Sequence, residues 1–319
     1  MADILYVVVP CYNEEEVLHE TAKRLKNKLE SLIRDDKISP RSRIMFVNDG
    51  SKDRTWELIS EFHRQCELFA GVDLSRNRGH QNALLAGLMT AKELADVTIS
   101  MDADLQDDIE AVDAMLDRYY DGCDIVYGVR SKREKDSFFK RATAEGFYKL
   151  MKGLGADTVF NHADYRLMSR RALEGLAQFK EVNLFLRGMV PMIGYKSDFV
   201  YYEREERFAG ESKYPLKKML AFAWEGVTSL SSKPIRMISL LGAGIFLISI
   251  GMIIYFIARY AVGATVEGWP SLICSVWAIG GLILLSLGII GEYIGKTYLE
   301  VKERPKFIVR QVLDSNKKD

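Results

Sequence analysis

Two long apolar runs near the C-terminus constrain this chain more than any other feature of its sequence. Residues 237–295 contain only three charged side chains, whereas the rest of the 319-residue chain carries 85. Ile238–Ile257 and Ser271–Ile290 are mostly apolar and contain no charge. At about 1.5 Å per residue, a helix of either run matches the roughly 30 Å hydrocarbon thickness of a bilayer. We therefore predict two transmembrane helices, at about 237–258 and 270–291, with a pair of buried soluble helices as the alternative.

The charges that flank these runs predict the orientation of the chain. Lys233 and Arg236 precede the first run, and Lys296 and Lys302 follow the second. Basic flanks stay on the cytoplasmic side of a membrane. Both termini and the N-terminal domain are therefore expected in the cytoplasm, as parts of a multi-pass protein of the inner membrane.

The overall composition argues against several classes of protein. The 44 basic and 44 acidic side chains balance, whereas a nucleic-acid-binding protein normally carries a basic excess. The four cysteines form no CxxC pair and no Cys/His cluster, so neither a zinc site nor a disulfide framework is indicated. Met1–Pro10 lacks the basic start and the length of a signal peptide. A globular domain joined to a membrane anchor is the organisation that remains.

Short β-branched runs alternate with helical patterns through the first 130 residues. Short apolar runs between polar segments predict strands, and apolar residues spaced three to four apart predict helices. The predicted strands are Ile4–Val9, Arg43–Val47, Gly71–Leu74, Val97–Met101 and Ile125–Tyr127, and the predicted helices are Glu14–Leu32, one that starts with Thr55–Phe62, Asn82–Leu94 and one near Ile109–Tyr120. Strand–helix alternation with short links predicts a mainly parallel sheet with right-handed crossovers.

Polar clusters follow the first four predicted strands. These clusters are Pro10–Glu15, Asn48–Asp53, Arg76–His80 and Asp102–Asp107. Ligands of open parallel sheets bind outside the carboxyl ends of the strands. A solvated loop would explain any one cluster alone, but four in succession predict one convergent site.

Asp102 and Asp104 form the chemical centre of the predicted site. Two carboxylates just beyond a buried strand present the hard oxygen ligands that suit Mg²⁺ or Mn²⁺, and a partly hydrated ion also binds phosphates. The chain has no Gly-x-x-x-x-Gly-Lys loop and no Gly-x-Gly-x-x-Gly segment after the first strand. These absences argue against a P-loop nucleotidase and a dinucleotide dehydrogenase. Helix capping by Asp104 or Asp107 is the structural alternative, and Asn13 and Asp53 are equally open to an N-cap role.

Six segments of the N-terminal domain form a set of family motifs. They are PCYNEE at Pro10–Glu15, VNDGSKD at Val47–Asp53, RNRGHQNALLAG at Arg76–Gly87, DADLQDD at Asp102–Asp108, DYRLMSR at Asp164–Arg170 and RFAGESKY at Arg207–Tyr214. Together they resemble family 2 glycosyltransferases of the polyprenyl-phosphate sugar synthase group, which includes dolichyl-phosphate mannose synthases and bacterial bactoprenol glucosyltransferases. The two apolar runs match the bacterial branch. The resemblance implies an α/β fold, a GT-A-type Rossmann-like domain with a mainly parallel sheet, followed by two C-terminal transmembrane helices. Asp108 departs from the family, which often has Pro there, and adds a negative charge near the metal.

The resemblance also implies which residues bind the sugar nucleotide. The nucleoside pocket would be lined by Pro10, Tyr12, Glu14 and Asp49, with Asp49 near the base. Asp102 and Asp104 would hold the diphosphate through Mg²⁺ or Mn²⁺, and Gln106 would contact the sugar or the metal shell.

Further residues are implied at the sugar and acceptor end of the site. Asp164 and Arg166 would act there, together with Asp104 and Gln106, as the catalytic group. The phosphate-facing residues would be Arg130, Arg207, Ser212 and Lys213. An Arg fork suits phosphate oxygens and Lys supplies a point charge. For Arg207 and Lys213 a surface salt bridge to nearby glutamates is the alternative.

The implied reaction is the inverting transfer of one sugar from a nucleotide sugar to polyprenyl (undecaprenyl) phosphate. A UDP-hexose such as UDP-glucose is preferred over a GDP-sugar, because the bacterial branch resembles UDP-sugar users. The metal and the arginines would stabilise the leaving diphosphate. The acceptor phosphate is already anionic, so Asp164 would position hydroxyls and no strong base is required. His80 is a conceivable general base, although capping or packing is favoured.

The predicted domain organisation follows from these assignments. A cytoplasmic glycosyltransferase domain is expected at 1–213, an interfacial amphipathic helix with its linker at 214–234, the two membrane helices within 235–295 and a cytoplasmic tail at 296–319. The interfacial helix, with lysines among large apolar side chains, would hold the site near lipid headgroups, and a buried globular helix is its alternative.

Two rival functions stay open, and so does the oligomeric state. One rival is a processive polysaccharide synthase, which usually has more spans and a Gln-x-x-Arg-Trp segment that this chain lacks. The other rival is a catalytically inactive membrane scaffold, against which the intact site residues argue. The family resemblance suggests a homo-oligomer.

Overall fold

The computed structural model describes residues 2–131, 162–182, 184–203 and 269–316, and scattered positions between 235 and 258. The chain divides into two compact units. One is an α/β unit that holds the N-terminal part and the residues from Arg304 onward, and the other contains the long helix α10 (Trp269–Val301). The predicted interfacial helix and the predicted phosphate-facing residues Arg207, Ser212 and Lys213 lie outside the described residues.

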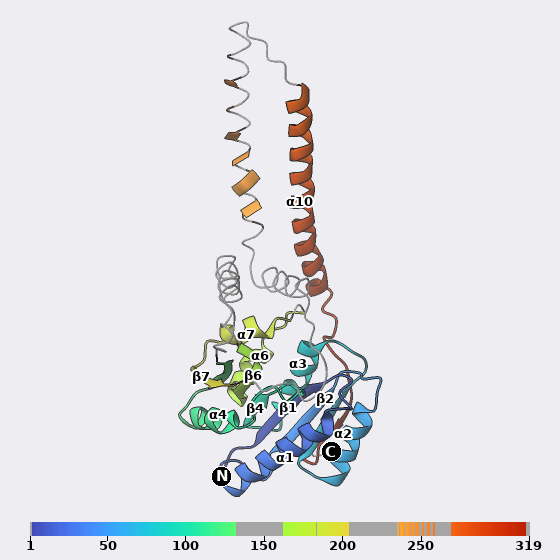
Figure 1. The fold of residues 1–319 in the computed structure, drawn as a ribbon, viewed down its shortest axis with the longest axis vertical. Coiled ribbons are helices and arrows are strands. Elements are labelled where there is room, and N and C mark those ends of the chain that lie inside the picture. Colours follow the sequence, from blue (N-terminus) through green and yellow to red (C-terminus); the bar gives the residue numbers. More distant parts are fainter. Residues whose placement is uncertain are drawn as a thin grey trace. The chain divides into compact units, whose positions relative to one another are not determined.

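An eight-stranded mixed sheet, in the order β7-β5-β6-β4-β1-β2-β3-β8, forms the centre of the α/β unit (Figure 1). The strands are β1 (Leu5–Cys11), β2 (Arg43–Asn48), β3 (Phe69–Leu74), β4 (Val97–Ser100), β5 (Ile125–Arg130), β6 (His162–Ser169), β7 (Ser197–Tyr202) and β8 (Val309–Leu313). The helices are α1 (Leu18–Arg34), α2 (Thr55–Gln65), α3 (His80–Ala91), α4 (Ala111–Tyr120), α6 (Arg170–Ala177) and α7 (Leu186–Met192). All five predicted strands and all four predicted helices form, with ends shifted by a few residues. The sheet is mixed, because β6 and β8 run antiparallel to their neighbours, but the other six strands share one direction, so the sheet is mainly parallel, as predicted.

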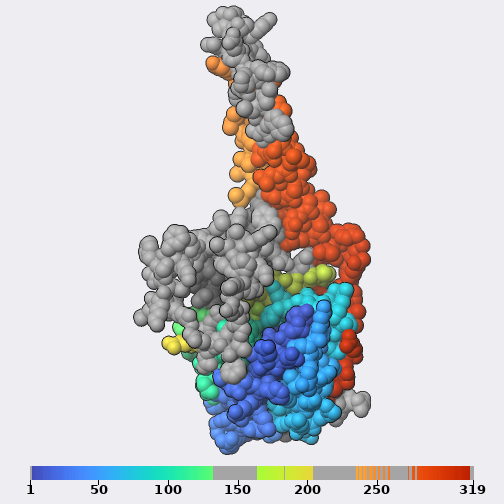
Figure 2. Space-filling model, turned by 45° about the vertical axis from the view of Figure 1, so that its right-hand side comes forward, coloured from blue at the N-terminus to red at the C-terminus, as the bar shows by residue number. Residues whose placement is uncertain are grey.

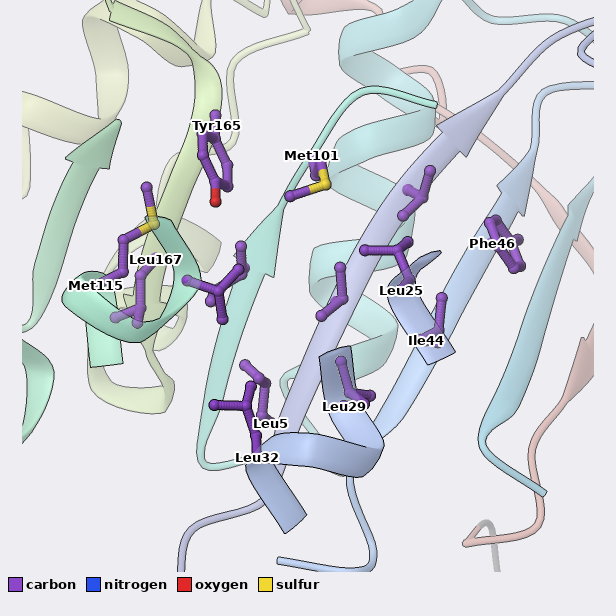
Figure 3. Close-up of a cluster of buried hydrophobic side chains, with 14 of the residues drawn as sticks. Leu5, Leu25, Leu29, Leu32, Ile44, Phe46, Met101, Met115, Tyr165 and Leu167 are labelled. Atoms are coloured by element: carbon purple, nitrogen blue, oxygen red, sulfur yellow. The ribbon is translucent and has the colours of Figure 1, made fainter. Parts of the chain in front are cut away.

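Helices cover both faces of this sheet. α1, α2 and α4 pack on one face, and α3, α6 and α7 pack on the other. Alternate residues of β1 therefore enter different clusters, with Val7 on the first face and Tyr6 on the second. Figure 3 shows part of the first cluster, where Leu29 of α1 lies near Ile44 of β2. A strand that is buried on both faces needs no polar alternation, which explains the continuous apolar runs of the sequence.

The carboxyl ends of the central strands lie together, as predicted. β4, β1, β2 and β3 are consecutive in the sheet and pair in parallel. Pro10 is tolerated near the end of β1 because the even-numbered residues of β1 direct their backbone groups toward β4, as the bond from Met101 N–H to Val8 O shows. β4 ends at Ser100, opposite Val8, so Pro10, which has no backbone N–H to donate, lies just beyond the last residue paired with β4.

The last strand, β8, was not predicted from the sequence. Residues 296–319 were expected to form only a tail, but Val309–Leu313 pair antiparallel with β3 and extend the sheet. Val309 and Val312 pack against the cluster on the α3 face, which accounts for the docking of this strand. In Figure 2 the C-terminal residues, in red, lie along the side of the N-terminal part of the unit. The tail is therefore partly a component of the α/β unit.

The second unit contains an apolar helix whose side chains are largely exposed. In the part of the chain that the structure describes, one helical segment, Ile279–Val301, is long and apolar enough to cross a membrane. Leu284 and Leu285 in this segment are 71% and 61% exposed. The helix predicted at 270–291 is thus part of a longer helix, α10. The described positions between 235 and 258 are all helical, and the membrane helix predicted there stays a prediction.

Candidate active site

The loops after β1 and β2 hold each other through hydrogen bonds. Asn13 N–H donates to Ser51 Oγ at 3.0 Å, and Lys52 N–H donates back to Asn13 Oδ1 at 2.9 Å. Asp53 accepts from Glu15 N–H and Thr55 N–H, at 3.2 and 3.1 Å. Asp53 thus holds the turn before α2, whose N-cap residue is Arg54, whereas Asn13 joins two loops. The segments PCYNEE and NDGSKD therefore form one structural element at the sheet edge.

Asp49 fixes the loop after β3. Its Oδ1 accepts from Arg78 N–H at 2.7 Å and its Oδ2 accepts from Gly79 N–H at 2.9 Å. Burial raises the pKa of this carboxyl, against the effect of the two backbone N–H donors. Gly50 allows the two loops to approach closely, since it has φ 62° and a Cβ there would lie 2.5 Å from Arg76 C. Asp49 thus has a direct structural function, and its predicted place near the base stays a prediction.

The other residues predicted for the nucleoside pocket lie on the same edge. Tyr12 follows β1 and is 42% exposed, so its ring is available to a ligand. Glu14 lies in the same loop, where its N–H donates to Thr55 Oγ1 at 2.9 Å. Pro10 is buried within β1 and shapes the strand end. Exposed Tyr12 is therefore the residue of this group best placed to contact a nucleoside.

Asp102 and Asp104 occupy the loop that follows β4. The side chain of Asp102 is 35% exposed, and Asp104 Oδ1 accepts from Gln106 N–H at 3.2 Å. Burial and the charges of Asp107, Asp164 and Asp104 raise the pKa of the Asp102 carboxyl to about 6, against the opposing charge of His80. Gln106 itself is 7% exposed. The loop thus concentrates negative charge that a bound cation would stabilise.

Asp164 lies beside Asp102 because of the strand register. β6 is antiparallel to β4 and pairs Arg166 with Ser100, so Asp164 stands two residues further on, level with Asp102. Arg166 Nη2 contacts Asp164 Oδ1 at 2.6 Å, and Arg187 Nη2 contacts Asp164 Oδ2 at 3.2 Å. Burial raises the pKa of Asp164, but the hydrogen bond with His80 and the two arginines outweigh it and hold this pKa well below its ordinary value. Asp164 is therefore an anion with a fixed orientation.

Two arginines, Arg166 and Arg187, contact Asp164, whereas the sequence predicted only Arg166 beside it. Arg166 is 1% exposed, so its guanidinium supports Asp164 from within the protein and does not reach a ligand here. Arg187, at the start of α7, is 35% exposed and approaches Asp164 from the open side. Arg187 was not predicted from the sequence, where its only signal is a charge within an apolar stretch. Arg166 is thus placed to position Asp164, and its predicted place among the catalytic groups stays a prediction.

His80 bridges the two carboxylates. Its Nε2 lies 3.5 Å from Asp102 Oδ1 and 3.4 Å from Asp164 Oδ2. Burial lowers the pKa of the imidazole, but the hydrogen bond with Asp164 and the charges of both carboxylates outweigh burial and raise it above the ordinary value. Capping or packing was the favoured sequence interpretation of His80, and the structure contradicts it. A partly exposed histidine held between carboxylates is suited to orienting them.

We expect His80→Ala to reduce the turnover number of the sugar transfer that the motif resemblance implies about tenfold, the value of one charge-assisted hydrogen bond. The variant leaves Asp102 and Asp164 without the imidazole that holds them. His19→Ala is a matched control, because the exposed His19 of α1 packs its ring edge against Phe62 of α2. Equal turnover of the His80→Ala and His19→Ala proteins would contradict the bridging role.

Arg130 lies at the far end of the same edge. Its Nη2 contacts Asp107 Oδ1 at 3.4 Å, and the same oxygen accepts from Tyr202 O–H at 2.5 Å. The parallel pairing of β5 with β7 places Arg130 beside Tyr202. The guanidinium is 26% exposed, and its contact with a phosphate stays a prediction.

Comparisons with known proteins agree with this architecture. The sequence profile of glycosyl transferase family 2 matches residues 6–176. YkoT, an uncharacterised glycosyltransferase of Bacillus subtilis strain 168, is 53% identical over 306 residues, covering 96% of this chain and 91% of YkoT. A prophage bactoprenol glucosyl transferase homologue of Escherichia coli K12 is 38% identical over 311 residues, covering 96% of this chain and 98% of that protein.

A solved structure shows a more remote likeness. Glucosyl-3-phosphoglycerate synthase from Mycobacterium tuberculosis, crystallised with Mn²⁺, UDP and phosphoglyceric acid, is 16% identical with a TM-score of 0.45. The match covers 72% of this chain and 78% of that one. A likeness at this level transfers no ligand to the present protein.

The mixed sheet, the loops at its edge and these relatives define a glycosyltransferase with a GT-A-like α/β fold. The chain belongs to glycosyl transferase family 2, since the family profile covers more than half of it and close relatives match nearly its whole length. The resemblance stated from the sequence motifs is thereby confirmed.

Proposed function

We propose that this glycosyltransferase transfers one hexosyl group from a nucleotide sugar, with UDP-glucose the preferred donor, to polyprenyl phosphate at the cytoplasmic face of the membrane. The observation that carries the proposal is the near full-length similarity to relatives named bactoprenol glucosyl transferases. That similarity includes the C-terminal apolar region as well as the α/β unit, because it spans 96% of this chain.

A membrane location supports a lipid acceptor. The apolar side chains of α10 are largely exposed, and Ile279–Val301 could cross a bilayer. Exposed apolar helices of this length need a membrane or a partner to cover them. We include two membrane helices in the proposal, with both termini and the α/β unit in the cytoplasm. A polyprenyl phosphate would present its phosphate at the same surface.

The loop after β4 fits a divalent cation. Asp102 and Asp104 supply carboxylate oxygens, and burial together with the neighbouring carboxylates raises the pKa of Asp102, which a cation bound there would counteract. Within the described residues, no three His, Cys, Asp or Glu side chains form a ready-made metal cage. Two carboxylates leave coordination positions for water and phosphate oxygens, as Mg²⁺ and Mn²⁺ require. When bound, the ion would stabilise charge on the leaving diphosphate.

The proposed reaction is a single displacement in which residues of the chain orient the reacting groups. An acceptor phosphate oxygen attacks the anomeric carbon, the bond from that carbon to the diphosphate breaks, and its electron pair leaves with the nucleoside diphosphate. One displacement of this kind inverts the anomeric configuration. The acceptor oxygen already carries negative charge, so no side chain needs to remove a proton. Asp164, held by His80, Arg166 and Arg187, would orient the sugar or the acceptor.

Nucleotide release by the detergent-purified chain tests the proposal. The assay contains Mg²⁺ or Mn²⁺, undecaprenyl phosphate and, one at a time, a panel of UDP- and GDP-hexoses. We expect release of UDP from one donor only when lipid is present, and its loss when EDTA removes the ion. Release from no donor, with the lipid shown to be accessible, would contradict the proposal.

A further inference from the structure

We propose that Arg310, on the strand that follows the apolar helix α10, is a positioning residue for the nucleotide pocket. It acts through the buried carboxylate of Asp73 on the loop Asn48–Ser51. The inference rests on the proposed function only in taking that loop as part of the nucleotide pocket.

A β-bulge directs Arg310 toward the sheet edge. β8 pairs Val309 with Leu74 and Gln311 with Asp73, so Arg310 is the extra residue between two paired positions. Bulges of this kind re-aim a side chain and interrupt the regular alternation. Arg310 Nη1 consequently lies 3.1 Å from Asp73 Oδ2, and its Nη2 donates to Ser75 O at 2.9 Å. The guanidinium therefore spans the carboxyl end of β3.

The carboxylate of Asp73 also contacts the neighbouring strand, β2, through Asn48. It is 1% exposed, and its Oδ1 accepts from Asn48 Nδ2 at 2.7 Å. Asn48 Oδ1 in turn accepts from Ser51 N–H at 3.1 Å. A carboxylate removed from water needs a cation and hydrogen-bond donors. Asn48 provides a donor to Oδ1, and Arg310 provides the cation beside Oδ2, which accepts no hydrogen bond from any residue that the structure describes. The orientation of the Asn48 amide thus depends on the position of Asp73.

The same chain of contacts reaches the loop after β1. Ser51 Oγ accepts from Asn13 N–H at 3.0 Å, next to exposed Tyr12. Polar contacts therefore run across β8, β3, β2 and β1 in their order in the sheet. Arg310 lies at the outer end of this series and the predicted nucleoside pocket lies at the inner end. Loss of Arg310 should increase the mobility of the loops after β1 and β2 without removing a ligand contact.

The strand itself does not depend on Arg310. Tyr6 O–H donates to Asp314 Oδ2 at 2.9 Å, and Asn316 Nδ2 donates to Tyr6 Oη at 3.0 Å, which holds the chain just beyond β8. The ladder with β3 also remains, since it is made by backbone groups. Arg310→Ala should therefore keep β8 docked and change only the contact with Asp73 and Ser75.

Hydrogen exchange and nucleotide affinity of the full-length protein test the inference together. In Arg310→Ala we expect the amides of Ser51 and Asn13 to exchange faster. The Kd for UDP, measured with Mn²⁺, should rise about tenfold, which corresponds to about 1.4 kcal/mol. Gln311→Ala is the matched control, being the exposed neighbour on the same strand, and should match the wild type in both measurements. Arg310→Lys keeps a charge but loses the fork, and should raise Kd only about threefold.

Kinetics separate positioning from a general loss of structure. The KM for the donor should follow the Kd, while kcat and the KM for the lipid change less than about twofold. Unchanged exchange at Ser51 and Asn13, or equal Kd values for Arg310→Ala and Gln311→Ala, would overturn the inference. If Arg310→Ala does not fold, the same comparison is made with Arg310→Lys. A wild-type protein that binds no UDP would instead count against the proposed donor, because the exchange measurement needs no nucleotide.

Discussion

Replacing Asp104 by Asn is expected to reduce glycosyl transfer by about a thousandfold, since a metal ion contributes several kcal/mol of transition-state stabilisation. The substitution keeps the size of the side chain and its acceptor oxygen for Gln106 N–H but removes the charge that would bind the ion. Nucleotide release at saturating donor and lipid measures the effect. The thermal unfolding temperature should change little, because Asp104 is partly exposed.

Asp108→Asn is the control for this prediction. Asp108 lies four residues further along the same loop and its Oδ1 accepts from Glu110 N–H at 2.9 Å. An asparagine keeps that local turn and removes the same charge. We expect activity within about twofold of the wild type, because Asp108 accepts a hydrogen bond within its own turn and is not one of the two carboxylates assigned to the ion. Equal losses for Asp104→Asn and Asp108→Asn would show that only the net charge of the loop matters.

Asp164→Asn is expected to have the second largest effect, with activity falling about a hundredfold, as misplacement of reacting groups by about 1 Å can do. The carboxylate of Asp164 holds His80, Arg166 and Arg187 together. Without it, Arg166 is left buried and unpaired, which should lower the free energy of unfolding by about 3 kcal/mol. Activity per folded molecule and urea unfolding measure the two effects separately.

Asp124→Asn is the control for Asp164. Like Asp164, Asp124 pairs with an arginine, Arg171, but it lies away from the carboxylate cluster, and its Oδ1 accepts from the Ser169 hydroxyl. We expect this variant to lose some stability and to keep its activity per folded molecule. An Asp164→Asn protein with normal activity per folded molecule would contradict the account of the site.

The parallel strands at the centre of the fold were predictable, because each of them can be recognised from its own short stretch of sequence. The runs that became β1 to β4 are buried on both faces, so they read as continuous apolar segments. Parallel pairing of neighbouring strands then places their carboxyl ends together, and the convergent site follows without knowledge of contacts. β8 gave no such signal, because an edge strand is only half covered and Arg310 interrupts its alternation.

The roles of individual charges were less predictable than their presence. Arg166 and Arg187 both contact Asp164. They differ in burial: Arg166 contacts Asp164 from the protein interior, whereas Arg187 is partly exposed. His80 contacts Asp102 and Asp164 only because β6 brings Asp164 level with the end of β4. Such pairings depend on register between distant strands, which the motif itself does not encode.

The mass of the lipid product tests the central claim most directly. The purified chain is incubated with undecaprenyl phosphate, Mg²⁺ or Mn²⁺ and the donor that supports nucleotide release. The molecular mass of the extracted lipid is then measured by mass spectrometry. We predict a single new species, polyprenyl phosphate plus one hexosyl group, that is absent with the Asp104→Asn protein. A ladder of products with two or more hexoses, or a lipid of unchanged mass despite nucleotide release, would contradict it.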